Sequence, residues 1–358
     1  MTKIIQIVTQ MEAGGAQRVA LWLADGLSTK GYDVEVWYLY KKRPLDHENV
    51  KTVVFFDGKP SKIADVLLII RRMAASLRNS RSDVIITHTH YSNIVCQFFA
   101  WIFKVPKRIA VQHNPLSTYP LLARYLDPLY GSLGIYTQIV AVSQSVAEAL
   151  AKTTVKYQKK MTVIHNGVPG APSSKIADVM KQREMLGLPG TSFLILNVGR
   201  LSHQKNQEFL LKLLQFQPDY HLVIVGEGEL RAYLESLAKE LCVSSRVTFA
   251  GEVPYKEVRK FYEIADVFAF PSQFESFGLA LVEAMRSELP ILASDIPAVH
   301  EIIGTSGYIL PLVPAEWVSA MKELEDNETL RRELGARGKV RSDRFSVETM
   351  VCTYEKLF

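Results

Sequence analysis

The chain has 358 residues and a mass of 40.3 kDa, which favours two domains over one or four. Hydrophobic residues make up 48% and charged residues 22%, so disorder is excluded as the main state, and no apolar run approaches the roughly 20 residues that span a bilayer. The net charge is +5, and the three cysteines, Cys96, Cys242 and Cys352, are too far apart for a disulfide framework or a zinc site, which favours a reducing cytoplasm.

The first half of the chain alternates short apolar runs with helical patterns. A glycine turn ends the first run, which is too short for a signal peptide. Near-continuous apolar strands of this kind are typical of a parallel sheet covered on both faces. The expected strands are Lys3–Thr9, Asp33–Tyr40, Asn49–Phe56, Val84–His88, Arg108–Gln112, Ile139–Val142 and Met161–Ile164, and the expected helices include Ala16–Ser28, Ile63–Arg78 and Ser145–Lys152.

The same alternation restarts after a polar stretch at Gly167–Lys175, which contains two prolines and is interpreted as a linker. The strands expected there are Phe193–Val198, His221–Val225, Arg246–Phe249, Val267–Phe270 and Ile291–Ala293. The sequence therefore predicts an α/β protein of two doubly wound, parallel-sheet, Rossmann-like domains. We expect an N-terminal domain at 1–168, a C-terminal domain at 169–342, and a helix within 343–358 that returns to the N-terminal domain.

In open α/β sheets, ligands bind at the carboxyl ends of the strands, so the loops there are the candidate sites. Gly14 and Gly15 follow the first strand and open a helix, whose free N–H groups favour phosphate. They do not form GxGxxG, and a simple tight turn would look the same. Arg200 and Lys205 follow strand Phe193–Val198, where both cations could converge on one diphosphate or could be solvated.

Two further loops of the second domain carry candidate residues. Gly226 ends the next strand, with a helix expected directly after it, and permits close backbone approach. Glu275 lies before a helix expected to start near Phe277, and Glu283 lies eight residues on, among apolar neighbours. Because a carboxylate in apolar surroundings costs free energy unless it is bonded, Glu283 indicates either a ligand's hydroxyls or an ion pair with a Lys or Arg.

The order Gly14-Gly15, Gly-Arg-x4-Lys at Arg200 and Lys205, and Glu-x7-Glu at Glu275 and Glu283 resembles the large retaining glycosyltransferase family 4, which has the GT-B fold. The resemblance covers essentially the whole chain. It implies two Rossmann-like domains that face a central cleft, with the nucleotide-sugar donor bound by the C-terminal domain and the acceptor on the N-terminal side.

The resemblance also implies individual roles. Arg200 and Lys205 would bind the donor diphosphate, Glu283 the ribose hydroxyls, and Glu275 the transferred sugar. Gly15 would close on the phosphates, and His113 matches the family histidine beside the donor sugar, although alone it is equally explained as a loop histidine. The implied catalytic residues are Glu275, His113, Arg200 and Lys205, and the implied donor-binding residues are Gly14, Gly15, Arg200, Lys205, Gly226, Val253, Phe277, Gly278, Leu279 and Glu283.

The sequence departs from the family pattern at three places. Pro169 stands where the interdomain segment often has an acid, Asn114 replaces a frequent aspartate, and Ile296-Pro297-Ala298-Val299-His300 replaces paired glycines before Glu301. The last departure leaves the shape of that side of the donor pocket open.

The implied reaction is retaining transfer of a hexosyl group from a nucleotide sugar, a UDP-sugar first and a GDP-sugar next, to a saccharide or lipid-linked acceptor in surface-polysaccharide or glycoconjugate synthesis. No Asp-x-Asp motif occurs, so we expect no metal and no other cofactor. His88 and His90 lack a third ligand and are interpreted as acceptor-side or structural residues. Two alternatives remain: a nucleotide-sugar hydrolase or epimerase, and a non-catalytic GT-B-like scaffold subunit.

The two halves of the chain differ in charge. Residues 1–165 carry 21 Lys and Arg against 11 Asp and Glu, a net of +10, and residues 166–358 carry 21 against 26, a net of −5. Aromatic and apolar residues lie beside cations within 98–108 and 119–130. The sequence predicts a cytoplasmic protein whose N-terminal domain contacts the inner face of the anionic membrane and which binds no nucleic acid, unless these segments are core and the charge is merely solvated.

Overall fold

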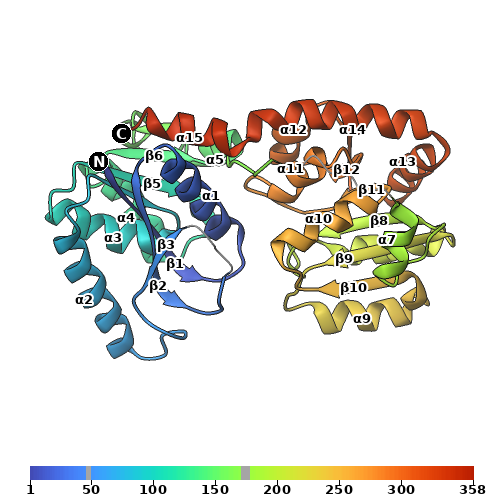
Figure 1. Cartoon of the computed structure of the whole chain (residues 1–358), viewed down its shortest axis with the longest axis horizontal. Helices are drawn as coiled ribbons and strands as arrows, with labels where there is room; N and C mark the ends of the chain where they lie inside the picture. Colours follow the sequence, from blue (N-terminus) through green and yellow to red (C-terminus); the bar gives the residue numbers. More distant parts are fainter. Residues whose placement is uncertain (46–49, 171–177) are drawn as a thin grey trace. The chain divides into compact units, whose positions relative to one another are not determined.

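The computed structural model describes residues 1–45, 50–170 and 178–358. The chain divides into two compact units (Figure 1): unit 1 comprises Met1–Pro169 and Phe345–Phe358, and unit 2 comprises Gly170–Arg344. The boundaries expected from the sequence fall one and two residues earlier. Most of the expected linker, residues 171–175, and Asn49 of the third expected strand lie outside the described residues.

Unit 1 is built on a seven-stranded parallel sheet in the order β3-β2-β1-β4-β5-β6-β7. The third strand is shorter than expected, because only four of its residues pair with the edge of the sheet. The strands are β1 Lys3–Met11, β2 Asp33–Lys41, β3 Lys51–Val54, β4 Val84–Thr87, β5 Lys107–Gln112, β6 Gln138–Ala141 and β7 Met161–Val163.

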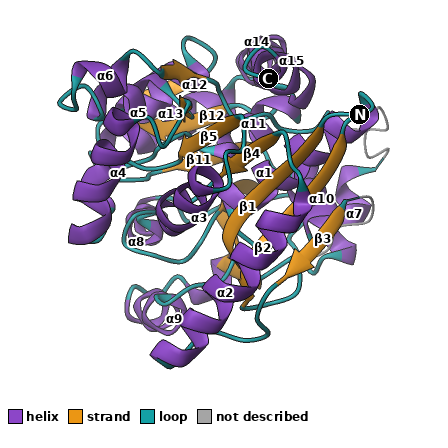
Figure 2. Cartoon of the chain, turned by 90° about the vertical axis from the view of Figure 1, so that its left-hand side faces the viewer, coloured by secondary structure: helices purple, strands orange, loops and turns teal. Residues whose placement is uncertain are grey.

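Helices cover both faces of this sheet (Figures 1 and 2), as a doubly wound fold requires. Buried side chains of α2 and α3, such as Met73 and Cys96, pack with Ile5 and Ile7 of β1 to form one core layer. The α1 helix lies on the other face and packs against α15. The helices are α1 Gly15–Thr29, α2 Ile63–Ser80, α3 His90–Ile102, α4 Leu121–Leu133, α5 Gln144–Ala149, α6 Val155–Gln158 and α15 Val347–Glu355.

Unit 2 repeats the plan with a six-stranded parallel sheet in the order β10-β9-β8-β11-β12-β13. Two strands, Phe193–Val198 and Val267–Phe270, have the predicted bounds, whereas the edge strand β13 was not predicted. The strands are β8 Phe193–Val198, β9 Tyr220–Val225, β10 Val247–Gly251, β11 Val267–Phe270, β12 Ile291–Ser294 and β13 Tyr308–Leu310.

The helices of unit 2 enclose a core in which the fully buried Trp317 packs edge-on against Phe209. In the described part of the chain, no helix has both the length and the apolar character needed to cross a bilayer. The helices are α7 Val179–Met185, α8 Gln207–Leu213, α9 Arg231–Glu240, α10 Tyr255–Ile264, α11 Leu279–Arg286, α12 Pro297–Ile303, α13 Pro314–Asp326 and α14 Glu328–Ser342.

The two segments of unit 1 meet where the second one begins. The Val168 amide donates to the Phe345 carbonyl at 2.9 Å, and a Cβ on Gly167 would lie 2.6 Å from the Ser346 carbonyl oxygen. Glycine is therefore required for this close approach. Since Val351 of α15 is buried, the C-terminal helix is part of the core of unit 1.

Candidate functional site

The strand order of each sheet reverses at one point, and loops on either side of that point meet at the carboxyl edge. In unit 2 the reversal lies between β8 and β11, and in unit 1 it lies between β1 and β4. Of the predicted catalytic and donor-binding residues, Gly14, Gly15 and His113 lie in unit 1, and all others lie in unit 2.

At the reversal in unit 2, the structure brings Lys205 and Glu275 together. Lys205 Nζ lies 2.5 Å from Glu275 Oε1, and the two side chains are only 18% and 8% exposed. The ammonium also lies over the Phe270 ring, 4.9 Å from its centroid. A charge-assisted hydrogen bond with so little solvent around it is strong and fixes the direction of the ammonium.

The loops that carry these two residues are tied to each other. The Asn206 amide group donates to the Pro271 carbonyl at 3.2 Å, and the Gln273 N–H donates to the Gln204 carbonyl at 2.9 Å. Asn206 adopts φ of +53°, a conformation that asparagine tolerates better than most residues. The Lys205–Glu275 pair is therefore set in a bonded frame before any ligand arrives.

Arg200 pairs with a different carboxylate from the one that Lys205 contacts. Its Nε donates to Glu229 Oε2 at 3.0 Å, and its side chain is 70% exposed. An exposed pair of this kind adds little stability, so the Arg200 guanidinium can leave Glu229 for a ligand at small cost.

Glu283 is buried in the middle of α11 and accepts a hydrogen bond of 2.9 Å from the Tyr262 hydroxyl. The Tyr262 hydroxyl thus satisfies one oxygen of this carboxylate in its apolar surroundings. The helix begins at Leu279 and not near Phe277, because Gly278 has φ of +91° and cannot continue the helical backbone.

Gly226 is required by the protein backbone itself. It has φ of +141°, and a Cβ there would lie 2.1 Å from the Gly199 carbonyl oxygen. The predicted helix does not follow directly, since α9 starts at Arg231. Of the other predicted donor residues, Phe277 is buried, Leu279 is half-buried at the start of α11, and Val253 is half-buried between β10 and α10.

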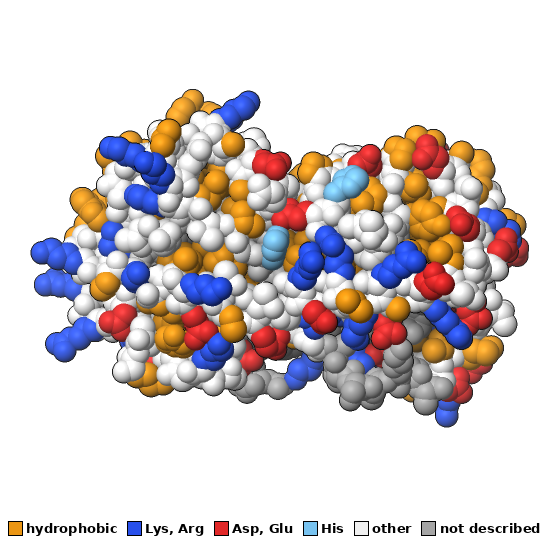
Figure 3. All heavy atoms as spheres, turned by 90° about the horizontal axis from the view of Figure 1, so that it is seen from above, with side chains coloured by type: hydrophobic (Ala, Val, Ile, Leu, Met, Phe, Trp, Pro, Cys, Tyr) orange, Lys and Arg blue, Asp and Glu red, His pale blue; other side chains and the backbone are white. Residues whose placement is uncertain are grey.

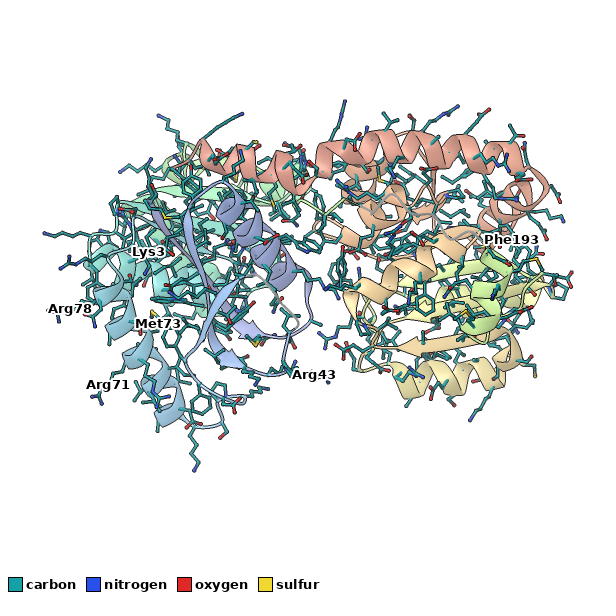
Figure 4. The ribbon with its side chains drawn as sticks, viewed as in Figure 1. Lys3, Arg43, Arg71, Met73, Arg78 and Phe193 are labelled. Atoms are coloured by element: carbon teal, nitrogen blue, oxygen red, sulfur yellow. The ribbon has the colours of Figure 1, made fainter. Side chains whose placement is uncertain are left out.

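Unit 2 also has a hollow at the opposite, amino edge of its sheet. It is lined by Phe193 and Tyr220, which open β8 and β9, and by Arg246 just before β10. Phe193 is labelled in Figure 4. Since ligands of open α/β sheets bind at the carboxyl edge, this hollow is not the candidate site.

In unit 1, the turn after β1 places Gly14 and Gly15 at the start of α1. Gly14 is the N-cap in an extended conformation, and a Cβ there would lie 2.5 Å from Gln17 Oε1. The Gln17 side chain in turn donates to the Gln10 carbonyl at 3.2 Å. This packing favours a small residue at position 14, and it leaves the N-terminal amides of α1 at the reversal point of the sheet.

His113 belongs to a chain of polar groups that crosses three strands. His88 Nδ1 lies 3.2 Å from His113 Nε2, and His88 Nε2 lies 2.7 Å from Gln6 Oε1. Because the Gln6 oxygen only accepts, His88 Nε2 donates, and its Nδ1 accepts from His113 Nε2. Burial lowers the pKa of His113 to about 4, and burial together with the neighbouring His113 lowers that of His88 well below its usual value. Both rings are neutral at pH 7.

These lowered pKa values predict a loss of stability in acid. Between pH 6.5 and about 4 the unfolded chain binds protons that folded His113 does not, so the unfolding equilibrium constant rises by up to about tenfold per pH unit as pH falls. Thermal unfolding of His113→Gln should show a weaker acid dependence in this window. His203→Gln, at an exposed position, is the control, and an NMR titration of His113 near pH 6.5 would contradict the prediction.

A buried carboxylate that the sequence analysis did not identify contacts the residue before His113. Asp127 of α4 is fully buried and accepts from the Gln112 amide group at 2.9 and 3.0 Å, from Tyr157 at 2.8 Å and from Tyr136 at 3.2 Å. Burial raises the pKa of Asp127. Since Gln112 directly precedes His113, this network fixes the start of the His113 loop.

The other histidine pair considered for a metal does not come together. His88 contacts His113, whereas the His90 ring packs against Tyr91 and Tyr119 at centroid distances of 4.2 and 5.0 Å. Within residues 1–45, 50–170 and 178–358, no three His, Cys, Asp or Glu side chains are placed to share one ion.

Two parallel-sheet α/β units with polar side chains at their reversal points define a protein of the GT-B fold. The structure is similar to that of Anabaena HepE in complex with UDP-glucose, with a TM-score of 0.84, 19% identity and 99% of each chain covered. This likeness concerns the fold.

The sequence comparisons give the family. The model described as Glycosyltransferase Family 4 matches residues 13–169, and the one described as Glycosyl transferases group 1 matches residues 178–341. The chain belongs to the group 1, family 4-type glycosyltransferases.

Two relatives represent the sequence matches. An uncharacterized glycosyltransferase of Methanocaldococcus jannaschii is 28% identical over 78% of this chain and 76% of its own length. An α-1,4-N-acetyl-D-galactosaminyltransferase of Campylobacter jejuni, named for a saccharide acceptor linked to undecaprenol by a diphosphate, is 26% identical over 97% and 95%.

Proposed function

We propose that the protein is a retaining hexosyltransferase that moves a sugar from a UDP-linked donor to a hydroxyl of a saccharide or lipid-linked acceptor, in surface-polysaccharide or glycoconjugate synthesis. The observation that carries this proposal is the Lys205–Glu275 pair at the reversal point of unit 2. It supplies one cation for a diphosphate and one carboxylate for sugar hydroxyls within a single frame.

The pair can serve both groups at once. A lysine ammonium has three N–H donors, so Lys205 can keep Glu275 and still donate to a phosphate oxygen. The second oxygen of Glu275 can accept from a hydroxyl of the sugar. Arg200, released from Glu229, would add charge on the diphosphate, and Glu283 would bind the ribose hydroxyls.

The proposed mechanism is attack by the acceptor hydroxyl on the face from which the leaving diphosphate departs. The C–O bond to the diphosphate breaks as the new glycosidic bond forms, and a phosphate oxygen takes the acceptor proton. Lys205 and Arg200 would stabilise the charge that develops on the leaving group. Neutral His113 would contact the sugar through hydrogen bonding rather than as a cation.

The choice of UDP and of a lipid-linked acceptor is supported by similar proteins. HepE binds UDP-glucose, and the Campylobacter relative is named for an undecaprenol-linked acceptor. Because a nucleotide-sugar donor and a lipid-linked acceptor would meet at the inner face of the membrane, we propose a cytoplasmic location there.

The geometry argues against hydrolase or epimerase chemistry. Such an enzyme needs an acid–base pair, and the hydrogen-bond partner of His113 in the structure is His88, itself held neutral. A scaffold without catalysis has no need of the costly, little-exposed Lys205–Glu275 arrangement.

The proposal is tested by offering UDP-, GDP- and ADP-linked sugars and measuring the rise in Tm, since a ligand of the native state stabilises it. UDP-sugars should give the largest rise. The anomeric configuration of the product, determined by NMR, then shows whether the configuration of the donor sugar is retained. No rise with any nucleotide sugar would overturn the donor assignment, and an inverted product would overturn the mechanism.

Activity is expected to survive chelation. If Lys205, Arg200 and helix N-termini neutralise the leaving diphosphate, kcat/KM with EDTA should stay within about twofold of kcat/KM without EDTA. The measurement is product formation before and after dialysis against EDTA, with and without added Mg²⁺ or Mn²⁺. Complete loss restored by either ion would show that the proposed metal independence is wrong.

A further inference from the structure

An apolar face covers the outside of α3 and α4 in unit 1. Its side chains are 44–73% exposed, although all are large and hydrophobic or aromatic. Four of them, on α4, repeat every four residues and therefore form one ladder along the helix. The apolar face consists of Tyr91, Trp101 and Ile102 on α3 and Leu121, Leu122, Tyr125, Leu129 and Leu133 on α4.

The two helices form one continuous surface. They pack against each other, and the Phe98 ring of α3 stacks on Tyr130 of α4 at 6.2 Å and lies 6.2 Å from Trp101. In Figure 2, α3 and α4 lie on the same side of the sheet. Clusters of exposed apolar side chains on a protein surface mark interaction sites.

The chain segment that carries most of the apolar face is strongly basic. Residues 98–160 contain eight Lys and Arg and two acids. One acid, Asp127, is fully buried, so Glu148 is the single exposed carboxylate of this segment. The exposed cations of the segment are Lys104, Arg124, Lys152, Lys156 and Lys159.

The neighbouring α2 helix extends this pattern. It packs against α3, buries Met73, and exposes Ile63 and Leu67 by 80% and 61%. Arg71 and Arg78 project outward from α2 while Met73 points to the sheet (Figure 4). Basic side chains also project from unit 1, at the left of Figure 3.

We propose that the apolar face seats unit 1 on an anionic lipid bilayer, with the leucines and Tyr125 of α4 in the headgroup boundary and the surrounding lysines and arginines on anionic headgroups. Apolar and aromatic side chains rimmed by cations suit this boundary. A second copy of the chain suits it less, because two basic rims would face each other.

The position of α4 connects this surface to the proposed reaction, and this link rests on the proposed function. The chain runs from His113 at the end of β5 to Leu121 and Leu122 at the start of α4. A bilayer under α4 would thus present a lipid-linked acceptor near the carboxyl edge of the sheet, where His113 lies.

The test is co-sedimentation with vesicles of phosphatidylglycerol and phosphatidylcholine, at low and high salt, against vesicles of phosphatidylcholine alone. Leu122→Ser with Tyr125→Ser should lower the partition coefficient at least tenfold. Phe216→Ser with Val340→Ser, at equally exposed positions of unit 2, should leave it unchanged. Arg124→Glu should lower it by more than the roughly fivefold expected for loss of one cation near an anionic leaflet.

Equal binding to neutral and anionic vesicles, or unchanged binding of the α4 variant, would overturn the proposal. So would a concentration-dependent dimer in light scattering that the α4 variant abolishes, since the occupant would then be a second copy. The rise in Tm with UDP, a property of unit 2, is measured on the same variants. If UDP gives no rise in Tm while the protein still binds vesicles, the donor proposal is rejected and the membrane proposal is retained.

Discussion

Replacing Lys205 by alanine is expected to lower kcat/KM by at least about a hundredfold, which corresponds to about 2.7 kcal/mol of transition-state stabilisation. The ammonium is held 2.5 Å from Glu275 in surroundings with little water, so the variant loses a cation and leaves a carboxylate unpaired. Arg200→Ala should cost less, about tenfold, because Arg200 is largely exposed.

A double-mutant cycle of Lys205→Ala with Glu275→Ala measures the coupling between the two side chains. The double variant should lose much less than the sum of the single losses, since they act as a unit. The control is Lys212→Ala, which removes a pair of similar length, 2.6 Å to Glu208, on the exposed side of α8. Additive losses, or a Lys205→Ala loss below tenfold, would reject the diphosphate role.

Asp127→Ala is expected to lower the free energy of unfolding of unit 1 by about 3 kcal/mol or more. The variant leaves the Gln112 amide group and the hydroxyls of Tyr136 and Tyr157 buried without their acceptor. Asp127→Asn should cost less, because one oxygen remains to accept. Asp326→Ala, on an exposed side chain of unit 2, should change stability by less than about 0.5 kcal/mol.

Urea denaturation followed by tryptophan fluorescence suits this measurement. Three of the four tryptophans, Trp22, Trp37 and Trp101, lie in unit 1, and Trp317 lies in unit 2. The Asp127 variants should shift the transition reported by unit 1 and leave the UDP-dependent stabilisation of unit 2 intact. A loss below 1 kcal/mol for Asp127→Ala would mean that water replaces the carboxylate.

Strand positions could be predicted because buried parallel strands are short, continuous apolar runs. Val267–Phe270 is such a run, and its bounds were predicted correctly. The edge strand Tyr308–Leu310 is only three residues long and half-buried, so its pattern could not be distinguished from a loop. The start of α11 was placed near Phe277 because the positive φ of Gly278 has no sequence signature beyond glycine itself.

The sequence predicts individual residues of the candidate site but not which of them contact each other. Lys205 and Glu275 are 70 residues apart, and their contact depends on β8 lying beside β11, which no local pattern encodes. The His88–His113 contact depends likewise on β4 lying beside β5. Asp127 was overlooked, although the argument applied to Glu283, a lone carboxylate among apolar residues, would have identified it.

The return of the chain to unit 1 has a consequence for synthesis on the ribosome. Unit 2 is one uninterrupted segment, whereas unit 1 is completed only by Phe345–Phe358, which are synthesised after all of unit 2. Unit 2 can therefore fold while translation continues, but the α1 surface that receives α15 stays uncovered until residues 345–358 have left the ribosome. A stop codon before residue 345 would thus leave the first-made half of the protein unfinished and its apolar surface open to aggregation.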